Sequence, residues 1–282
     1  MIDTHCHVWR IELLHRAWTP PKLIDRTVRV GDVLSAARNV ALDGVILVES
    51  GTSDQENRWL AGVAARNPRV LGFVTYADPM DPRLGERLDR WRRAAKFRGV
   101  RFRLEGVHDG SFPTTHAFVE ALRLLKDRNL VAELLIEPGH MGPLAKTLDR
   151  VSGVKVVIDH MAKPSLAAAN DKRQRAIWQQ GMQALATSPS TCCKLSLSLP
   201  AGDLSDVSNA LRFNDVAFVA SYTRYALTQF GASRCCWGSD WPLSSLFASY
   251  EAVLGTAQAS LEPLSADDRD AVFRATAARI YA

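Results

Sequence analysis

The sequence predicts an α/β fold, a single (β/α)8 TIM barrel in which eight parallel strands close into a cylinder surrounded by helices. Eight short apolar segments with strand character alternate with segments whose apolar residues recur at helical spacing. Such alternation is typical of parallel strands joined by helical crossovers. Eight units favour a closed barrel over an open sheet, and 282 residues is an ordinary length for one. No stretch rich in glycine, proline or serine divides the chain, so we expect one domain over residues 1–282.

The predicted strands are apolar on both faces, as expected when side chains fill the barrel and helices cover its outside. They comprise residues 2–8, 45–49, 70–76, 99–104, 131–137, 154–160, 191–197 and 234–241. The predicted helices comprise residues 32–42, 54–65, 84–95, 115–126, 168–185, 215–230 and 267–278. Asp32, Ser53 and Ser265 stand where helix N-caps belong, because their side-chain oxygens can accept hydrogen bonds from free backbone amides.

The connection after the first strand is unusually long. It covers residues 10–30 and holds Trp18 and a Pro-Pro pair. In a barrel this connection lies at the C-terminal end of the strands, where active sites are built. We expect it to form a lid or a pocket wall.

The composition is that of a soluble globular protein, with 47% hydrophobic and 23% charged residues. The net charge of +5 comes from arginines spread along the predicted helices, which favours a solvated basic surface over a nucleic-acid site. No apolar run approaches the roughly 18–20 residues that span a membrane, so no membrane contact is expected. No charged-then-apolar leader opens the sequence, and we expect a cytoplasmic protein.

Four of the five cysteines form two adjacent pairs, Cys192-Cys193 and Cys235-Cys236. The odd number and the spacing fit neither a disulfide framework nor a zinc module. If the pairs lie on neighbouring strands, they approach one another. We expect small, buried, reduced thiols in the barrel wall.

The first predicted strand ends with His5-Cys6-His7. Residues two apart face the same side of a strand, so both imidazoles point one way. Two such rings can share a metal ion or donate hydrogen bonds to one oxyanion.

Two other predicted strands end in residues that can join this pair. Asp240 ends the eighth strand, which neighbours the first in a closed barrel, and His160 ends the sixth. The carboxyl ends of all the strands meet at one end of a barrel. We therefore expect an active site of His5, His7, His160 and Asp240.

Arg101 and Arg103 alternate with apolar residues on the fourth strand, so both guanidiniums share a face. If that face is the lumen, the outer Arg103 reaches the pocket and can bind a substrate carboxylate with two parallel hydrogen bonds. An ion pair with Glu49 or Glu105 is the alternative. Three further candidates for substrate contact are His140 after the fifth strand, Lys194 on the seventh and Trp241 at the end of the eighth. His140 could also ligate a metal, and Lys194 could pair with an acid.

In order along the chain, these motifs resemble the amidohydrolase superfamily, specifically the amidohydrolase-related branch that contains 2-pyrone-4,6-dicarboxylate lactonase, L-fuconolactonase and L-rhamnonolactonase. The matching motifs are Ile-Asp-Thr-His-Cys-His-Val-Trp at 2–9, Gly-Val-Arg at 99–101, Asp-His-Met-Ala-Lys-Pro at 159–164, Lys-Leu-Ser at 194–196 and Gly-Ser-Asp-Trp-Pro at 238–242. The resemblance implies a distorted barrel of the amidohydrolase type that opens a lactone with water. Asp240 would activate the water, and His5, His7 and His160 would polarise the carbonyl.

The sequence departs from the binuclear members of the superfamily, which carry a bridging carboxylated lysine and histidines after both the fifth and sixth strands. Here the fourth strand carries arginines, and only the sixth ends in histidine. A binuclear centre is therefore not expected. The resemblance leaves two expectations open, a site with no obligatory metal and a single zinc or manganese on His5, His7 and Asp240.

Three other functions fit parts of the pattern. A zinc-dependent decarboxylase of the same superfamily shares the paired histidines and the aspartate of the eighth strand. A lactone isomerase would bind a similar ring without releasing an acid. The third is a barrel without enzymatic activity that serves as a binding module. The intact set of His5, His7, His160 and Asp240 argues against it, because binding alone would not require these residues. The expected partner is a small lactone.

Overall fold

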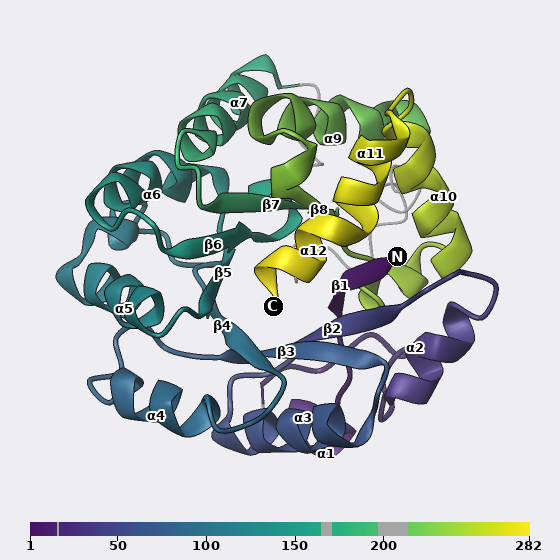
Figure 1. The fold of residues 1–282 in the computed structure, drawn as a ribbon, viewed down its shortest axis with the longest axis horizontal. Helices are drawn as coiled ribbons and strands as arrows, with labels where there is room; N and C mark the ends of the chain where they lie inside the picture. The colour runs from purple at the N-terminus through teal and green to yellow at the C-terminus, as the bar shows by residue number, and fades with distance from the viewer. Residues whose placement is uncertain (16, 165–170, 197–213) are drawn as a thin grey trace.

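The computed structural model describes residues 1–15, 17–164, 171–196 and 214–282. Its eight strands form one parallel sheet in the order β1 to β8, which confirms the predicted (β/α)8 barrel (Figure 1). The strands are β1 (Ile2–Cys6), β2 (Gly44–Val48), β3 (Val70–Tyr76), β4 (Phe97–Arg103), β5 (Val131–Leu135), β6 (Lys155–Ile158), β7 (Thr191–Leu195) and β8 (Cys235–Trp237). Several are shorter at their carboxyl ends than predicted, because the site residues lie in the turns beyond them. Residue 197 lies outside the described part of the chain.

The barrel closes between β1 and β8 through a few specific contacts. Thr4 Oγ1 donates to the carbonyl of Trp237 over 2.7 Å. Further along, the amide of Asp240 donates to His5 O over 2.9 Å and that of His7 to Trp241 O over 2.8 Å. These bonds place the end of the first strand directly beside the loop that carries Asp240.

The helices lie outside the strands. They are α1 (Ile11–Leu14), α2 (Val30–Ala36), α3 (Asp54–Arg66), α4 (Leu84–Trp91), α5 (His116–Asp127), α6 (Pro138–Arg150), α7 (Lys172–Ala186), α9 (Val216–Phe230), α10 (Tyr250–Ser260), α11 (Ala266–Asp270) and α12 (Thr276–Ile280). Each predicted helix overlaps one of these, although residues 168–170 lie outside the description. The predicted last helix is α11 and α12 joined by a π-helical turn.

Three helices, α1, α6 and α10, were not predicted. The first is a four-residue helix inside the connection of residues 10–30. Pro143 interrupts the helical signal of α6, and α10 is rich in small residues without a clear apolar stripe. Ser53 and Ser265 cap helices as expected. The prediction for Asp32 was wrong, because it lies inside the first turn of α2 and accepts from the amide of Arg29.

The amino-terminal end of the barrel is closed by the C-terminal helices, which cross it in the foreground of Figure 1. Ile280 and Tyr281 pack there on lumen residues of the strands, including Ile46, Val131 and Val157. This apolar layer excludes water from one end of the lumen, so a site can open only at the other end.

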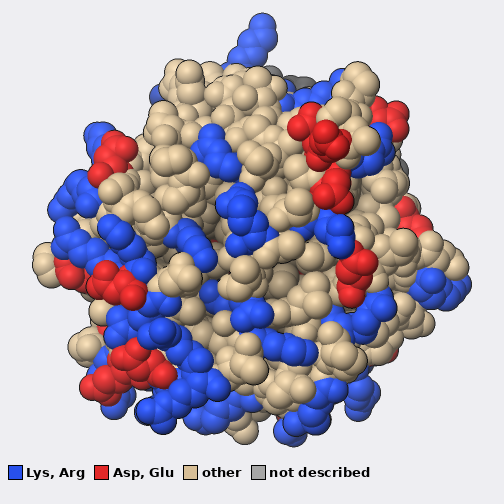
Figure 2. Space-filling model, viewed as in Figure 1, with Lys and Arg blue, Asp and Glu red and all other residues tan. Residues whose placement is uncertain are grey.

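Basic side chains are scattered among acidic ones over the face in Figure 2, with many near α4. Several are paired there: Asp89 lies 2.8 Å from Arg128 and 3.8 Å from Arg92. Exposed pairs of this kind contribute little to stability. Within the described residues, no helix has the length and apolar character needed to cross a membrane.

All five cysteines are buried free thiols. The two adjacent pairs do lie on neighbouring strands, with Cys193 opposite Cys235 in the register of β7 and β8. Burial raises the pKa of both thiols well above the usual value, so they stay protonated and unreactive.

Gly238 is required by the closure of the barrel. A Cβ at this position would lie 2.6 Å from His5 Cβ, whose backbone is fixed by the bonds across the seam. We expect Gly238→Ala to lower the free energy of unfolding by about 1–3 kcal/mol, measured by urea denaturation. The matched control is Gly255→Ala in α10, where a Cβ meets nothing within 4 Å, and it should stabilise by roughly 0.5–1 kcal/mol. Wild-type stability for Gly238→Ala would contradict this account.

Candidate active site

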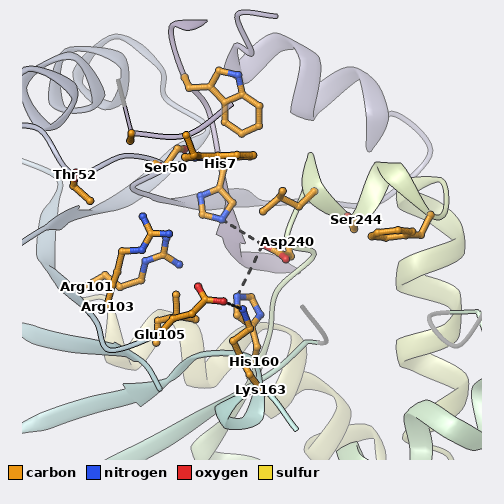
Figure 3. A pocket seen from close by; sticks show the side chains of 16 residues that line it. His7, Ser50, Thr52, Arg101, Arg103, Glu105, His160, Lys163, Asp240 and Ser244 are labelled. Carbon is orange, nitrogen blue, oxygen red and sulfur yellow. Dashed lines mark hydrogen bonds and ion pairs between the residues drawn. The ribbon is translucent and has the colours of Figure 1, made fainter. Parts of the chain in front are cut away.

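A cavity of about 210 Å³ opens at the carboxyl ends of the strands (Figure 3). Its lining residues come from β4 and β5, from the turns after β2, β4, β6 and β8, and from the segment after β1 that includes the long connection. They are His7, Trp9, Ala17, Trp18, Ser50, Thr52, Arg101, Arg103, Glu105, Leu135, His160, Lys163, Asp240, Leu243, Ser244 and Phe247. One wall is therefore aromatic and aliphatic, and the other carries charges and hydroxyls. The expected role of residues 10–30 as a pocket wall agrees with the positions of Ala17 and Trp18.

The four predicted residues converge on one carboxylate oxygen. Asp240 Oδ1 lies 3.3 Å from His7 Nε2, 3.8 Å from His5 Nε2 and 4.0 Å from His160 Nε2. All four residues are at least 97% buried. His7 and His160 face the cavity with Asp240, as Figure 3 shows. His5 is fully buried and is not among the residues that line the cavity.

A buried acid, Asp3, holds the loop that presents Asp240. Asp3 Oδ1 accepts from the amides of His5 and Ser239 over 3.1 and 2.9 Å. Its other oxygen accepts from the hydroxyl of Tyr250 over 2.8 Å. Asp240 itself has a positive φ of 57°, a conformation that a non-glycine residue keeps only when its surroundings fix it.

His160 is presented by a strained turn. The residues from His160 to Lys163 all have positive φ, between 48° and 59°. Left-handed backbone costs roughly 1–2 kcal/mol per non-glycine residue. Trp178 Nε1 stabilises the turn by donating to Met161 O over 2.7 Å, and His160 Nδ1 lies 2.8 Å from Ser196 Oγ. The left-handed backbone of this turn therefore lowers the stability of the fold, and in return it fixes the orientation of the His160 imidazole.

Burial and neighbouring charged groups have opposing effects on the pKa values in this cluster. Burial lowers the pKa of His160 to about 4, so this ring is neutral near pH 7. Burial alone would raise the pKa of Asp240, but His160, His7 and His5 outweigh it and hold that pKa below the usual value. Asp240 is therefore a carboxylate throughout the physiological range and can accept a proton.

Beneath the cavity lies a buried charge layer made of Glu49, Arg101, Glu133, Asp159 and Lys194. Lys194 Nζ is 2.7 Å from Glu133 Oε2 and 3.2 Å from Asp159 Oδ1. The predicted pairing of Lys194 with an acid is confirmed, and its partners are Glu133 and Asp159. Lys194 is fully buried and is not among the residues that line the cavity, so it does not lie where the predicted substrate contact would require.

The two arginines of β4 both line the cavity, and Glu49 faces both. Arg101 Nε donates to Glu49 Oε1 over 2.6 Å, and Arg103 Nη1 lies 3.8 Å from Glu49 Oε2. The alternative of an ion pair with Glu49 is therefore observed. Arg103 is the more exposed of the two, as expected for the outer position.

Two predicted contact residues lie away from the cavity. His140 begins α6, where its Nδ1 accepts from the amide of Glu137 and its Nε2 lies 2.9 Å from Val107 O. Both of its ring nitrogens face backbone groups. Trp241 is buried in the hydrophobic core and pairs with Cys6 across the seam of the barrel.

Sequence reasoning missed several residues of the site. Lys163 and Glu105, an ion pair on the cavity wall, come from different turns, and no spacing in the sequence connects them. Glu133 and Asp159 were not recognised as part of the charge layer, although an acid within an apolar strand is a detectable signal.

His7 and Asp240 fit a cation. His7 Nδ1 lies 3.0 Å from Val48 O and must donate to it, so in a neutral His7 the Nε2 lone pair faces Asp240 Oδ1. That oxygen is buried and accepts no hydrogen bond among the described residues. Two sets have ligand atoms close enough together to share one ion: His5, His7 and Asp240, and His5, Asp159 and His160.

Glu56 in α3 supports the polar wall by accepting from the amide of Ser50 over 2.7 Å. Burial, and then Glu49, raise its pKa to about 7 from the ordinary 4.5. The folded protein therefore binds more protons than the unfolded chain between these pH values, so its stability falls as pH rises through the window.

We expect Glu56→Gln, which cannot ionise, to flatten this dependence. Urea unfolding from pH 4.5 to 7.5 should show a weaker fall in stability for Glu56→Gln than for wild type. Glu120→Gln removes an exposed carboxylate of α5 and serves as the control. Parallel pH profiles for wild type and Glu56→Gln would refute the assignment.

The amidohydrolase family model matches residues 2–282. The L-fucono-1,5-lactonase of Burkholderia ambifaria is 31% identical over 99% of this chain and 94% of its own length. That of Burkholderia multivorans is 30% identical over 100% and 95%. Among solved structures, an amidohydrolase from Burkholderia multivorans with bound zinc has a TM-score of 0.87 and 29% identity, and covers 99% of this chain and 98% of its own.

A probable 2-pyrone-4,6-dicarboxylic acid hydrolase from Acinetobacter baumannii, solved with citric acid bound, is more distant. Its TM-score is 0.75 at 19% identity, covering 99% of this chain and 98% of its own. At that identity the likeness concerns the fold alone.

Proposed function

This chain belongs to the amidohydrolase family, and we propose that it is a hydrolase that opens a small lactone with water. One observation supports the reaction most directly: a buried carboxylate oxygen of Asp240 that accepts no hydrogen bond among the described residues and borders the cavity. Such an oxygen is available to accept a proton from water. The full-length similarity to two L-fucono-1,5-lactonases supports the substrate class.

Asp240 takes a proton from the attacking water, whose oxygen bonds to the lactone carbonyl carbon. The ring C–O bond then breaks, and Asp240 returns the proton to the leaving oxygen, giving a hydroxy acid. His160 is neutral near pH 7 and borders the cavity, so its Nε2 can donate to the developing oxyanion when Ser196 donates to Nδ1. The strained turn after β6 fixes that ring in advance.

A divalent ion, zinc or manganese, is supported by His7 and Asp240 as ligands, with His5 as the expected third. When bound, it would act as a Lewis acid and lower the pKa of water. His5 is the weakest of the three, because Lys194 already occupies its Nδ1 and Arg101 Nη1 lies 3.4 Å from its Nε2.

The cavity wall favours a neutral, hydroxylated lactone over a carboxylated one. The three described cations that line it each face a carboxylate: Arg101 and Arg103 face Glu49, and Lys163 is paired with Glu105. A substrate carboxylate would have to break one of these pairs. Hydroxyl groups can instead bond to the paired charges, while the opposite wall, with Trp9 and Trp18, covers an apolar ring face.

Replacing the proposed base tests the mechanism. Asp240→Asn keeps the shape of the side chain but cannot take a proton, and we expect kcat to fall by about 10²–10⁴-fold. Circular dichroism should show an intact fold. Asp267→Asn, which changes an exposed aspartate of α11, is the matched control and should retain full turnover. Near-normal turnover by Asp240→Asn would refute the role of this residue.

A substrate panel tests the lactone class. Acid release should be measured for neutral sugar lactones and for dicarboxylated lactones, before and after chelation with pyridine-2,6-dicarboxylate and with zinc or manganese restored. We expect kcat/KM for the best neutral lactone to exceed that for carboxylated ones by on the order of tenfold or more. A preference for dicarboxylated lactones would contradict the inference that the ion-paired cations of the cavity wall favour a neutral lactone. If no lactone of the panel is hydrolysed, the decarboxylase alternative is favoured. A carbon dioxide trap would then detect the product of that reaction.

A further inference from the structure

Lys194 is surrounded by acceptors. Besides Glu133 and Asp159, its ammonium lies 3.0 Å from Nδ1 of His5. All four side chains are fully buried, so no water competes for these contacts. An ammonium has three N–H donors and no lone pair, and each of its partners must therefore accept.

His5 must present a lone pair at Nδ1 to Lys194. A neutral imidazole carries one proton, which then lies on Nε2. Two contacts favour the opposite arrangement, Asp159 Oδ1 at 3.5 Å from Nδ1 and Arg101 Nη1 at 3.4 Å from Nε2. Both exceed the usual hydrogen-bond range of about 2.7–3.2 Å, whereas the Lys194 contact lies within it.

His7 is held as the opposite tautomer. Its Nδ1 lies 3.0 Å from the carbonyl oxygen of Val48, which only accepts, so Nδ1 carries the proton. The lone pair of His7 is then on Nε2, which faces Asp240.

We infer that Lys194 is a positioning residue that fixes His5 as the Nε2–H tautomer, opposite to that of His7, and thereby opposes metal binding through His5. The two histidines of one strand then have different functions. His5 directs its proton toward Asp240 from beneath the cavity, while His7 alone offers a lone pair. A divalent ion can use His5 Nε2 only if that proton moves to Nδ1 and the Lys194 contact is lost. The inference rests on the proposed function only for the role of Asp240 as base.

The tautomers can be measured directly in the wild-type protein. Histidine-selective ¹⁵N labelling and long-range ¹H–¹⁵N correlation, after chelation at neutral pH, distinguish protonated from unprotonated ring nitrogens. Spectra of His5→Gln and His7→Gln assign the two rings. We expect an unprotonated Nδ1 in His5 and an unprotonated Nε2 in His7. A protonated Nδ1 in His5 would overturn the inference. It would leave the proposal of lactone hydrolysis untouched, because the measurement is made without substrate and does not test the reaction.

Removing the ammonium should change the tautomer. In Lys194→Met, His5 Nδ1 should become protonated and donate to Asp159, and zinc should bind on the order of tenfold more tightly by calorimetry. The double variant Lys194→Met/Glu133→Gln removes one positive and one negative charge. It replaces the single variant in this experiment if Lys194→Met does not fold. Lys96→Met is the matched control, since that lysine donates to Ala64 O and Asn67 O away from the site. An unchanged His5 tautomer and zinc affinity in the folded Lys194 variants would refute the role of Lys194.

Discussion

The site depends on the seam where the barrel closes. Hydrogen bonds from Asp240 N to His5 O and from His7 N to Trp241 O join the end of the first strand to the loop after the last. Without them the paired histidines and the carboxylate, more than 230 residues apart in sequence, would not meet. Gly238 permits the close approach, and Asp3 bonds to both sides of the seam. The same contacts that complete the fold therefore assemble the proposed catalytic group.

The lumen is arranged in layers along the barrel axis. Apolar side chains and the C-terminal helices close one end, the buried charge layer follows, and the cavity opens at the other end. Replacing a whole buried ion pair with well-packed apolar side chains is often neutral or stabilising, so the contribution of the charge layer to stability does not by itself explain why it is present. Its contacts with His5 provide a reason, because they set which nitrogen of that ring carries the proton.

Strand ends were readable from the sequence because polar residues that follow apolar strands meet at one end of a barrel. His5, His7, His160 and Asp240 were predicted on this basis, and the structure brings them together. His140 was predicted in the same way but lies away from the cavity, because a histidine after a strand can equally bond the backbone of the next helix. The cavity walls could not be predicted, since pairs such as Lys163 and Glu105 depend on loop conformations that no periodicity encodes.

If water opens a lactone at this site, as we propose, the oxygen atom of that water must appear in the carboxylate of the product. The reaction should be run in ¹⁸O-labelled water with the best substrate of the panel, and the product analysed by mass spectrometry after one turnover per enzyme. We expect one ¹⁸O atom in the carboxylate of a ring-opened hydroxy acid. An unlabelled product of unchanged mass, as from isomerisation, or a product that has lost carbon dioxide would contradict the proposal.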